Sequence, residues 1–125
     1  MYNLILVASG GALGALLRFT LGGILKLYFQ SNFYATLCIN ISGSFLIGYL
    51  ISLGYSKSLP EYFIKYFLII GLLGSFTTFS TFSYEVIELY LSKKIFLSMS
   101  YIILSVVLCI VASYLGVYIN KFWLK

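Results

Sequence analysis

The amino-acid sequence predicts an all-α membrane protein with a single domain, residues 1–125, that crosses the bilayer with four helices. Hydrophobic residues make up 62% of the chain and charged residues 9%, against roughly 45–50% and about 25% in ordinary soluble domains. A soluble chain of this length has too little interior to bury so much apolar surface, so the surplus must face lipid. The apolar residues also fall into four long stretches separated by short polar breaks.

Each apolar stretch is long enough for a hydrocarbon core of ~30 Å, which takes ~20 helical residues to cross. The stretches are Leu4–Phe29, Phe33–Tyr55, Leu59–Leu91 and Ile95–Ile119. The first is too long for the core of a signal peptide and no basic residue precedes it, so we expect a retained span. The third is expected to begin at Ser58-Leu59-Pro60-Glu61, which has the spacing of a helix capping box.

Small and polar residues recur at helical spacing on the first two spans. Gly10 and Gly14 form a G-x-x-x-G pair, which lets helices approach closely in lipid. Arg18 lies inside the first span, where a charge either extends to the interface or faces a water-filled vestibule that attracts anions. On the second span, one face carries four residues spaced by four: Thr36, Asn40, Ser44 and Gly48. An amide at that depth bonds either to another helix or to a permeating species.

The middle of the third span is expected to depart from a straight helix. Its 33 residues would make one helix of ~50 Å, which exceeds the core. Gly71 and Gly74 precede a run rich in hydroxyls, where the helix can open. Opened backbone must be buried in protein or line a cavity, and its carbonyls are good ligands for a hard cation such as Na⁺. The alternative is a continuous helix in which Thr77 and Thr78 bond back to their own backbone.

Aromatic rings and a narrow polar stripe follow the predicted break. Phe79 and Phe82 share a helix face, while Ser80 and Thr81 point elsewhere. The positive edge of a phenyl ring can contact an anion, although both rings facing lipid is the alternative. The last span carries four residues spaced by four, which either line the same path or join helices: Tyr101, Ser105, Cys109 and Ser113. Both cysteines, Cys38 and Cys109, are interpreted as small packing residues.

The titratable residues exclude most enzyme chemistry. The chain has no His and no Asp, so it cannot form a histidine triad or a histidine metal site, and we expect no enzyme. Glu85 and Glu88 lie toward the end of the third span and are expected to face the membrane interface. The eight basic residues are scattered, which gives no indication of nucleic-acid binding.

The basic residues are divided almost evenly between the two sides of the predicted bundle. One side carries Lys57, Lys65, Lys121 and Lys125. The other carries Lys26, Lys93 and Lys94, with Arg18 if it extends that way. A chain without a positive-inside bias can insert in both orientations, and two copies can then pair antiparallel. A single topology set by one or two loop charges is the alternative.

Three motifs, in order along the chain, resemble those of the small bacterial fluoride channels of the Fluc or CrcB family. They are Gly-Gly-x-x-Gly-Ala-x-x-Arg at Gly10–Arg18, Asn-x-x-Gly-Ser-Phe-x-x-Gly at Asn40–Gly48, and Gly-x-x-Gly-x-Phe-Thr-Thr-Phe-Ser-Thr-Phe at Gly71–Phe82. The third is the most specific. The resemblance implies a passive, fluoride-selective channel that exports fluoride from the cytoplasm across the cell inner membrane and gives fluoride resistance.

The resemblance also implies an assembly and a set of site residues. The assembly would be an antiparallel, dual-topology homodimer in the lipid bilayer, with two pores and a structural Na⁺ at its centre. In the pore, Phe79 and Phe82 would present ring edges to fluoride and Asn40 would donate a hydrogen bond. The backbone carbonyls of Gly74 and Thr77 would hold Na⁺. The remaining positions are a polar track of Ser80, Thr81 and Thr36, a vestibule residue, Arg18, and Tyr101 on the last helix, where Cys109 replaces an expected hydroxyl.

A small four-span, proton-coupled multidrug exporter is the main alternative. Such a transporter couples to protons through a membrane carboxylate in its first helix, and the first two spans here contain no acid. A non-transporting assembly subunit would explain the glycines but not the motif that ends at Phe82.

Overall fold

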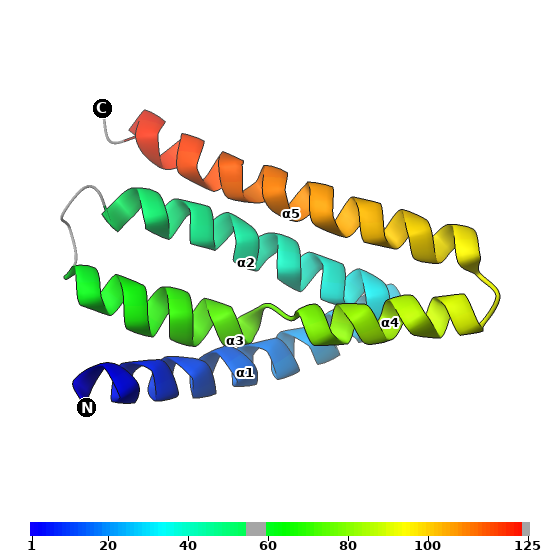
Figure 1. The fold of residues 1–125 in the computed structure, drawn as a ribbon, viewed down its shortest axis with the longest axis horizontal. Helices are drawn as coiled ribbons and strands as arrows, with labels where there is room; N and C mark the ends of the chain where they lie inside the picture. The colour runs from blue at the N-terminus through cyan, green and yellow to red at the C-terminus, as the bar shows by residue number, and fades with distance from the viewer. Residues whose placement is uncertain (55–59, 124–125) are drawn as a thin grey trace.

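The computed structural model describes residues 1–54 and 60–123, whose regular elements are all helical (Figure 1). The long helices are α1 (Tyr2–Phe29), α2 (Asn32–Gly54) and α5 (Ile95–Trp123). The third span consists of a π-helix, η1 (Phe63–Leu73), a single turn, α3 (Gly74–Phe76), and α4 (Phe79–Leu91). Within residues 1–54 and 60–123, four helical segments are long and apolar enough to cross a membrane, which confirms the prediction of an all-α, four-span protein. The predicted capping residues Ser58 and Leu59 lie outside the described residues.

The second and fifth helices pack closely because each contributes a glycine to the contact. α2 lies along α5 (Figure 1). A methyl group added to Gly48 would overlap the backbone of Ser113, and one added to Gly116 would overlap the backbone of Phe45. Small residues allow this approach in lipid, where helices gain little from burying apolar side chains against one another.

Glycines also bring α1 against the first half of the third span. A methyl group on Gly14 would meet the carbonyl of Leu72, and one on Gly71 would lie 3.1 Å from the Cα atom of Gly10. The predicted G-x-x-x-G pair is therefore a helix contact. The partner element is a π-helix, which the sequence did not predict and whose i→i+5 turns are wider than those of an α-helix.

The third span is interrupted where the sequence placed the break. α3 ends at Phe76, and Thr77 and Thr78 are extended, with φ/ψ of −78°/155° and −146°/121°. The side chain of Thr78 then caps α4 by accepting a hydrogen bond from the Thr81 amide at 3.1 Å. A small buried cluster of Ile39, Leu73 and Phe76 lies beside the break. The continuous-helix alternative is therefore wrong.

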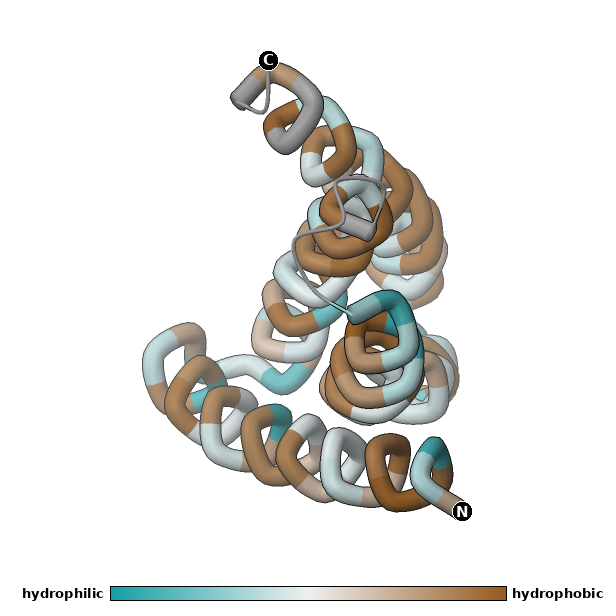
Figure 2. The backbone as a smooth tube through the Cα atoms, turned by 90° about the vertical axis from the view of Figure 1, so that its left-hand side faces the viewer, coloured by the Kyte–Doolittle hydropathy of each residue, from teal (hydrophilic) through white to brown (hydrophobic). Residues whose placement is uncertain are grey.

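α1 leaves the bundle in its second half. It packs against η1, α3 and α2 but not against α4, and Figure 2 shows it sweeping outward along the edge of the bundle. Apolar residues occur on all sides of the helices in the same view, and side chains such as Phe19 and Phe96 are 80% and 87% exposed. Such exposed side chains suit a lipid environment.

Candidate functional site

The break in the third span is held by the side chain of Asn40. Its amide Nδ2 donates to the Thr78 carbonyl at 3.0 Å, and its Oδ1 accepts from the Thr78 amide at 2.8 Å. The side chain thus bonds both backbone groups of one extended residue and ties α2 to the unwound segment. A carboxamide has two N–H donors, so Asn40 keeps one N–H for a further partner.

These bonds leave two backbone carbonyls without their ordinary helical partners. In an α-helix, the Gly74 carbonyl would accept from the Thr78 amide and the Thr77 carbonyl from the Thr81 amide. The Thr78 amide instead bonds Asn40, and the Thr81 amide bonds the Thr78 hydroxyl. Gly74 is also exposed. Both carbonyls belong to residues that the family resemblance implies as Na⁺ ligands.

Aromatic rings continue from the break along α4 to α5. The centroids of Phe79 and Phe82 are 5.4 Å apart with planes at 52°, and Phe82 meets Tyr101 edge to face at 5.2 Å. Phe82 is 7% exposed, whereas Phe79 is 76% exposed. The described chain therefore encloses one ring of the pair and leaves the other open to whatever lies beside it.

A buried carboxylate lies one turn beyond Phe82. Glu85 is 4% exposed. Its Oε1 accepts from the Thr36 hydroxyl and its Oε2 from the Tyr101 hydroxyl, each at 2.7 Å. Three spans meet at this group. The expectation that Glu85 faces the membrane interface is wrong, because two hydroxyls from neighbouring helices replace the water it would lose there.

A cavity of about 320 Å³ lies beside the break, between α2, α4 and α5. Its polar lining consists of Asn40, Ser44, Thr77, Thr78, Ser105 and Cys109, and its aromatic lining of Phe79 and Phe82. The side chain of Ser105 is buried, at 6% exposed, and lies one helical turn from Tyr101 on α5.

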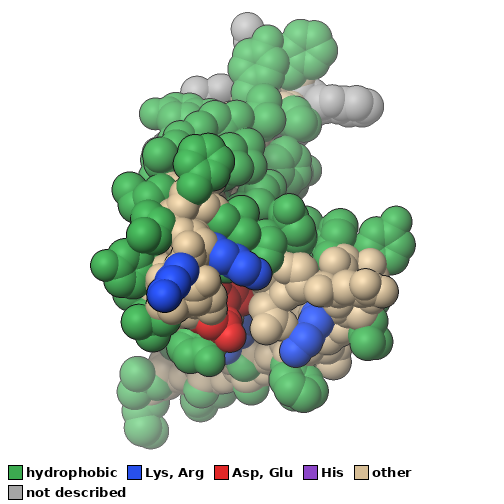
Figure 3. Space-filling view, turned by 90° about the vertical axis from the view of Figure 1, so that its right-hand side faces the viewer, with side chains coloured by type: hydrophobic (Ala, Val, Ile, Leu, Met, Phe, Trp, Pro, Cys, Tyr) green, Lys and Arg blue, Asp and Glu red, His purple; other side chains and the backbone are tan. Residues whose placement is uncertain are grey.

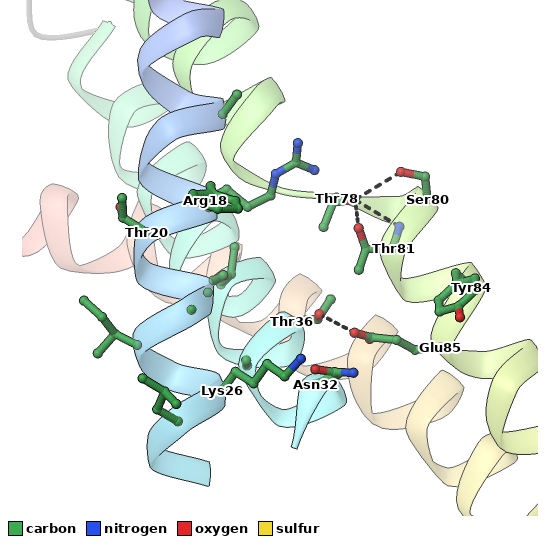
Figure 4. A pocket seen from close by; sticks show the side chains of 18 residues that line it. Arg18, Thr20, Lys26, Asn32, Thr36, Thr78, Ser80, Thr81, Tyr84 and Glu85 are labelled. Atoms are coloured by element: carbon green, nitrogen blue, oxygen red, sulfur yellow. Dashed lines mark hydrogen bonds between the residues drawn. The ribbon is translucent and has the colours of Figure 1, made fainter. Parts of the chain in front are cut away.

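A larger cleft of about 1120 Å³ separates α1 from α4 (Figure 4). The α1 wall carries Arg18, which has no hydrogen bond or ion pair with the described residues, and Lys26. The opposite wall carries hydroxyls and one carboxylate: Thr36, Thr78, Ser80, Thr81 and Glu85. Thr78 is the residue that lines both this cleft and the smaller cavity.

Charged side chains gather at the end of the molecule where α4 turns into α5 (Figure 3). Figure 3 shows Lys and Arg side chains around a recess that contains acidic side chains. A third cavity of about 180 Å³ lies there, lined by Glu85, Glu88, Ser92 and Lys94 among others. Glu85 and Asn32 line both this cavity and the large cleft, so polar groups continue from the α4–α5 turn to the break.

A family model described as "CrcB-like protein, Camphor Resistance (CrcB)" matches residues 5–117. The chain belongs to the CrcB-like family. Among its relatives, the fluoride-specific ion channel FluC of Campylobacter hominis is 39% identical, and the match covers 96% of each chain. The protein of the same name from Shewanella pealeana is 42% identical over 93% of this chain and 94% of its own. That of Flavobacterium psychrophilum is 39% identical over 97% and 98%.

This CrcB-like chain distributes its predicted site residues over two cavities. Asn40, Thr77, Phe79 and Phe82 line the smaller one, whereas Ser80, Thr81, Thr36 and Arg18 line the cleft. Tyr101 lines neither and instead joins Phe82 to Glu85. On α5 the polar stripe divides: Ser105 and Cys109 face the smaller cavity, while the Ser113 hydroxyl donates to the Ser44 carbonyl at 2.9 Å and joins two helices.

Glu85 is the residue that sequence reasoning missed. Its position gives a usable signal, because it follows Phe82 by three residues as Phe82 follows Phe79. Residues three apart share a helix face, which places Glu85 beside Phe82 on α4, although Phe79 at the same spacing is 76% exposed. The sequence analysis placed Glu85 at the membrane interface because it lies near the end of the apolar stretch.

Proposed function

We propose that the protein is a passive, fluoride-selective channel that exports fluoride from the cytoplasm and thereby gives fluoride resistance. The observation that carries the proposal is the match, over nearly the whole chain, to relatives named fluoride-specific ion channels. The family is a channel family and not an enzyme family. With four apolar spans, the chain is a multi-pass membrane protein, consistent with the cell membrane as its location.

The donors around the two cavities suit a small, strongly hydrated anion. Such an ion leaves water only for well-placed hydrogen bonds, and it must bind weakly enough to leave again. The smaller cavity is lined by Asn40, with its second N–H, by the hydroxyl residues Ser44 and Ser105, and by the rings of Phe79 and Phe82. These are neutral groups, so none holds an anion as a fixed charge would. In the cleft, Arg18 and its neighbour Lys26 raise the local anion concentration.

An antiparallel homodimer with dual topology accounts for the surfaces that the chain leaves open. Phe79 is 76% exposed beside a polar cavity, where a ring of a second copy would complete the pair. The cleft between α1 and α4 gives room for such a copy. The even division of basic residues between the two sides permits both orientations in one membrane.

A structural Na⁺ at the dimer centre fits the carbonyls at the break. Gly74 and Thr77 have carbonyls whose ordinary partners bond elsewhere, and neutral backbone oxygens suit a hard monovalent cation. Two copies would supply four such oxygens. The ion would offset the cost of unpaired carbonyls inside a membrane.

Gly74→Ala tests this assembly. Within one chain, an added methyl at Gly74 would meet only the Ile69 carbonyl, at 3.5 Å, so the isolated fold tolerates alanine. We expect the variant to lose dimer on gel filtration and to lose the dependence of efflux on Na⁺, because the methyl would crowd the opposing copy. A dimer of unchanged stability and unchanged Na⁺ dependence would contradict the central site.

Glu85 also bears on the competing function, a proton-coupled exporter, because such a protein needs a membrane carboxylate. Both Glu85 oxygens accept hydrogen bonds from fixed neighbours and the residue is 4% exposed. That environment suits a group that orients hydroxyls within the bundle. It does not suit a carboxylate that alternates between the two sides of the membrane.

Anion efflux from liposomes distinguishes the two functions. We expect purified protein to release fluoride down its gradient with the proton gradient collapsed by an ionophore, and to release chloride no faster than protein-free liposomes. Neutral donors at close quarters favour the smaller anion. Fluoride release that stops without a proton gradient would support the exporter, and equal chloride release would overturn the proposed selectivity.

A further inference from the structure

The third cavity, of about 180 Å³, opens on the outside at the turn between α4 and α5; we call it the turn cavity. Its exposed rim is formed by Glu88, Ser92 and Lys94. Two further lining residues, Asn32 and Glu85, also line the large cleft between α1 and α4. Glu85 is 4% exposed, so it lies at the inner end. The turn cavity therefore adjoins the cleft and opens it to the outside at the end of the molecule that Figure 3 shows.

The backbone on both sides of Lys94 is fixed by hydrogen bonds. Its amide donates to the Leu89 carbonyl at 3.0 Å, which closes the end of α4, and its carbonyl accepts from the Ser98 amide at 3.0 Å, in the first turn of α5. Lys93, with φ of 61°, makes the reversal between the two helices, as a left-handed residue commonly does after a helix. As a result, Lys94 lines the turn cavity, and Lys93 is not among the residues that line it.

The charge of Lys94 is not taken up by a neighbour. Its side chain is exposed and makes no hydrogen bond or ion pair with the described residues. Two carboxyl groups share the cavity: that of Glu85, which accepts from Thr36 and Tyr101, and that of Glu88. An unpaired ammonium group among carboxyl groups acts on passing ions through its electric field and not through one fixed contact.

We propose that the turn cavity is an entrance to the fluoride path, and that Lys94 admits the anion by offsetting the negative charge of the two glutamates on its wall. The inference rests on the proposed function, since it needs an anion that moves through the cleft. Carboxylates beside an anion path lower the local anion concentration, and a cation among them raises it. Lysine suits an entrance because its ammonium is a mobile point charge, without the forked geometry by which arginine holds an anion.

Lys93 provides a matched control for Lys94. It is the adjacent residue, carries the same charge and is also exposed, but it does not line the turn cavity. Glutamine removes the charge at either position and keeps most of the side-chain length. At Lys93 the backbone also accepts glutamine, because Gln30 adopts the same left-handed conformation, with φ of 52°, at the end of α1.

The experiment measures fluoride efflux from liposomes of zwitterionic lipid, so that no lipid charge competes with the lysines. An impermeant organic salt sets the ionic strength, and fluoride is a small part of the total. At about 0.01 M, where the Debye length is about 30 Å, we expect Lys94→Gln to slow efflux about two- to threefold, as one unit charge acting across water would. Lys94→Arg and Lys93→Gln should keep the rate of the unsubstituted protein.

Raising the ionic strength separates an electrostatic role from a structural one. At about 1 M the Debye length is about 3 Å, so we expect the Lys94→Gln rate to return to that of the unsubstituted protein at the same salt. A deficit that persists at high salt would overturn the proposal, because it would show that Lys94 supports the fold of the turn. Equal slowing in Lys93→Gln would also overturn it, because the effect would then belong to the whole surface.

Glu88→Gln gives the opposite prediction at the same cavity. Removing a carboxylate from the rim should speed fluoride efflux about two- to threefold at low ionic strength, a result that a poorly folded variant cannot produce. Unchanged or slower efflux would contradict the inference while leaving the proposed function intact. Unsubstituted protein that releases no fluoride would instead overturn the proposed function, so the two failures are distinguishable.

Discussion

The two halves of the third span meet α1 in opposite ways. The first half, η1 and α3, packs directly against α1, with Gly10 and Gly14 on one side and Gly71 on the other. The second half, α4, does not pack against α1, and the space between them is a cleft lined by Ser80, Thr81 and other hydroxyl residues. One half of the span therefore anchors the bundle and the other half faces a polar space.

The difference shows that small residues permit two helices to approach closely in a membrane but do not by themselves make them do so. Lipid tails are as apolar as leucine side chains, so helices pack where backbones can approach and not merely where side chains are apolar. Gly14 lies against the backbone of Leu72, whereas Gly23, farther along α1, has no neighbour within 4 Å. Helix α1 thus carries glycines both where it is packed and where it has moved away.

The largest loss of stability is expected from a substitution in the half of the third span that packs against α1. In Gly14→Ala the new methyl would lie 2.9 Å from the Leu72 carbonyl carbon, so the helices must separate, at a cost of about 1–3 kcal/mol. Gly23→Ala, with open space around it, is the matched control. Thermal unfolding of both variants in detergent checks this, and equal midpoints would show that the close approach carries no stability.

The next effect is expected at the break between the halves. Asn40→Ala removes both bonds to Thr78 and should cost about 1–2 kcal/mol. The Thr78 amide should then exchange its hydrogen faster, and fluoride efflux should fall. Ser42→Ala is the control, because Ser42 is exposed and donates only to the Ile39 carbonyl of its own helix. Unchanged exchange at Thr78 would mean that Asn40 does not hold the break.

In the open half we expect a smaller change in interaction energy, but a clear loss of fluoride efflux. Phe82→Met keeps apolar volume and removes the ring edge, which is worth about 1 kcal/mol, or roughly a fivefold drop in fluoride efflux. Phe79→Met should act in the same direction. Phe96→Met, at 87% exposed, should change neither efflux nor assembly. Normal efflux from Phe82→Met, with a normal gel-filtration profile, would show that the ring only packs.

The sequence predicts most of the fold because its strongest signals are local. Hydropathy over ~20 residues marks a span without reference to any partner, and the polar residues near 30 and 93 mark turns, where Gln30 and Lys93 adopt φ of 52° and 61°. The break was predictable for the same reason, since glycines and hydroxyls lie next to each other in the chain. The π-helix was not, because no residue type distinguishes it from an α-helix.

The site was predicted less completely because its partners come from different helices. The sequence allowed Asn40 to hydrogen-bond either to another helix or to a permeating ion. It could not show that Asn40 bonds both backbone groups of Thr78, because that depends on how α2 approaches the break. Glu85 was misplaced because its burial depends on Thr36 and Tyr101 supplying hydroxyls. The residue type alone indicates how much free energy it costs to bury the side chain. It does not show which hydrogen-bond partners offset that cost.

The position of Thr78 limits how this chain can evolve. Its hydroxyl caps α4, both its backbone groups are bonded by Asn40, and its side chain, 8% exposed, lies where the two cavities meet. In a solvent-exposed helix a lost cap is replaced by water, but the Thr78 side chain is 8% exposed and its cap has no such replacement. Serine keeps the capping oxygen without adding charge or volume, so Thr78→Ser is the substitution that this position tolerates. Lipid-facing positions nearby can exchange one apolar residue for another.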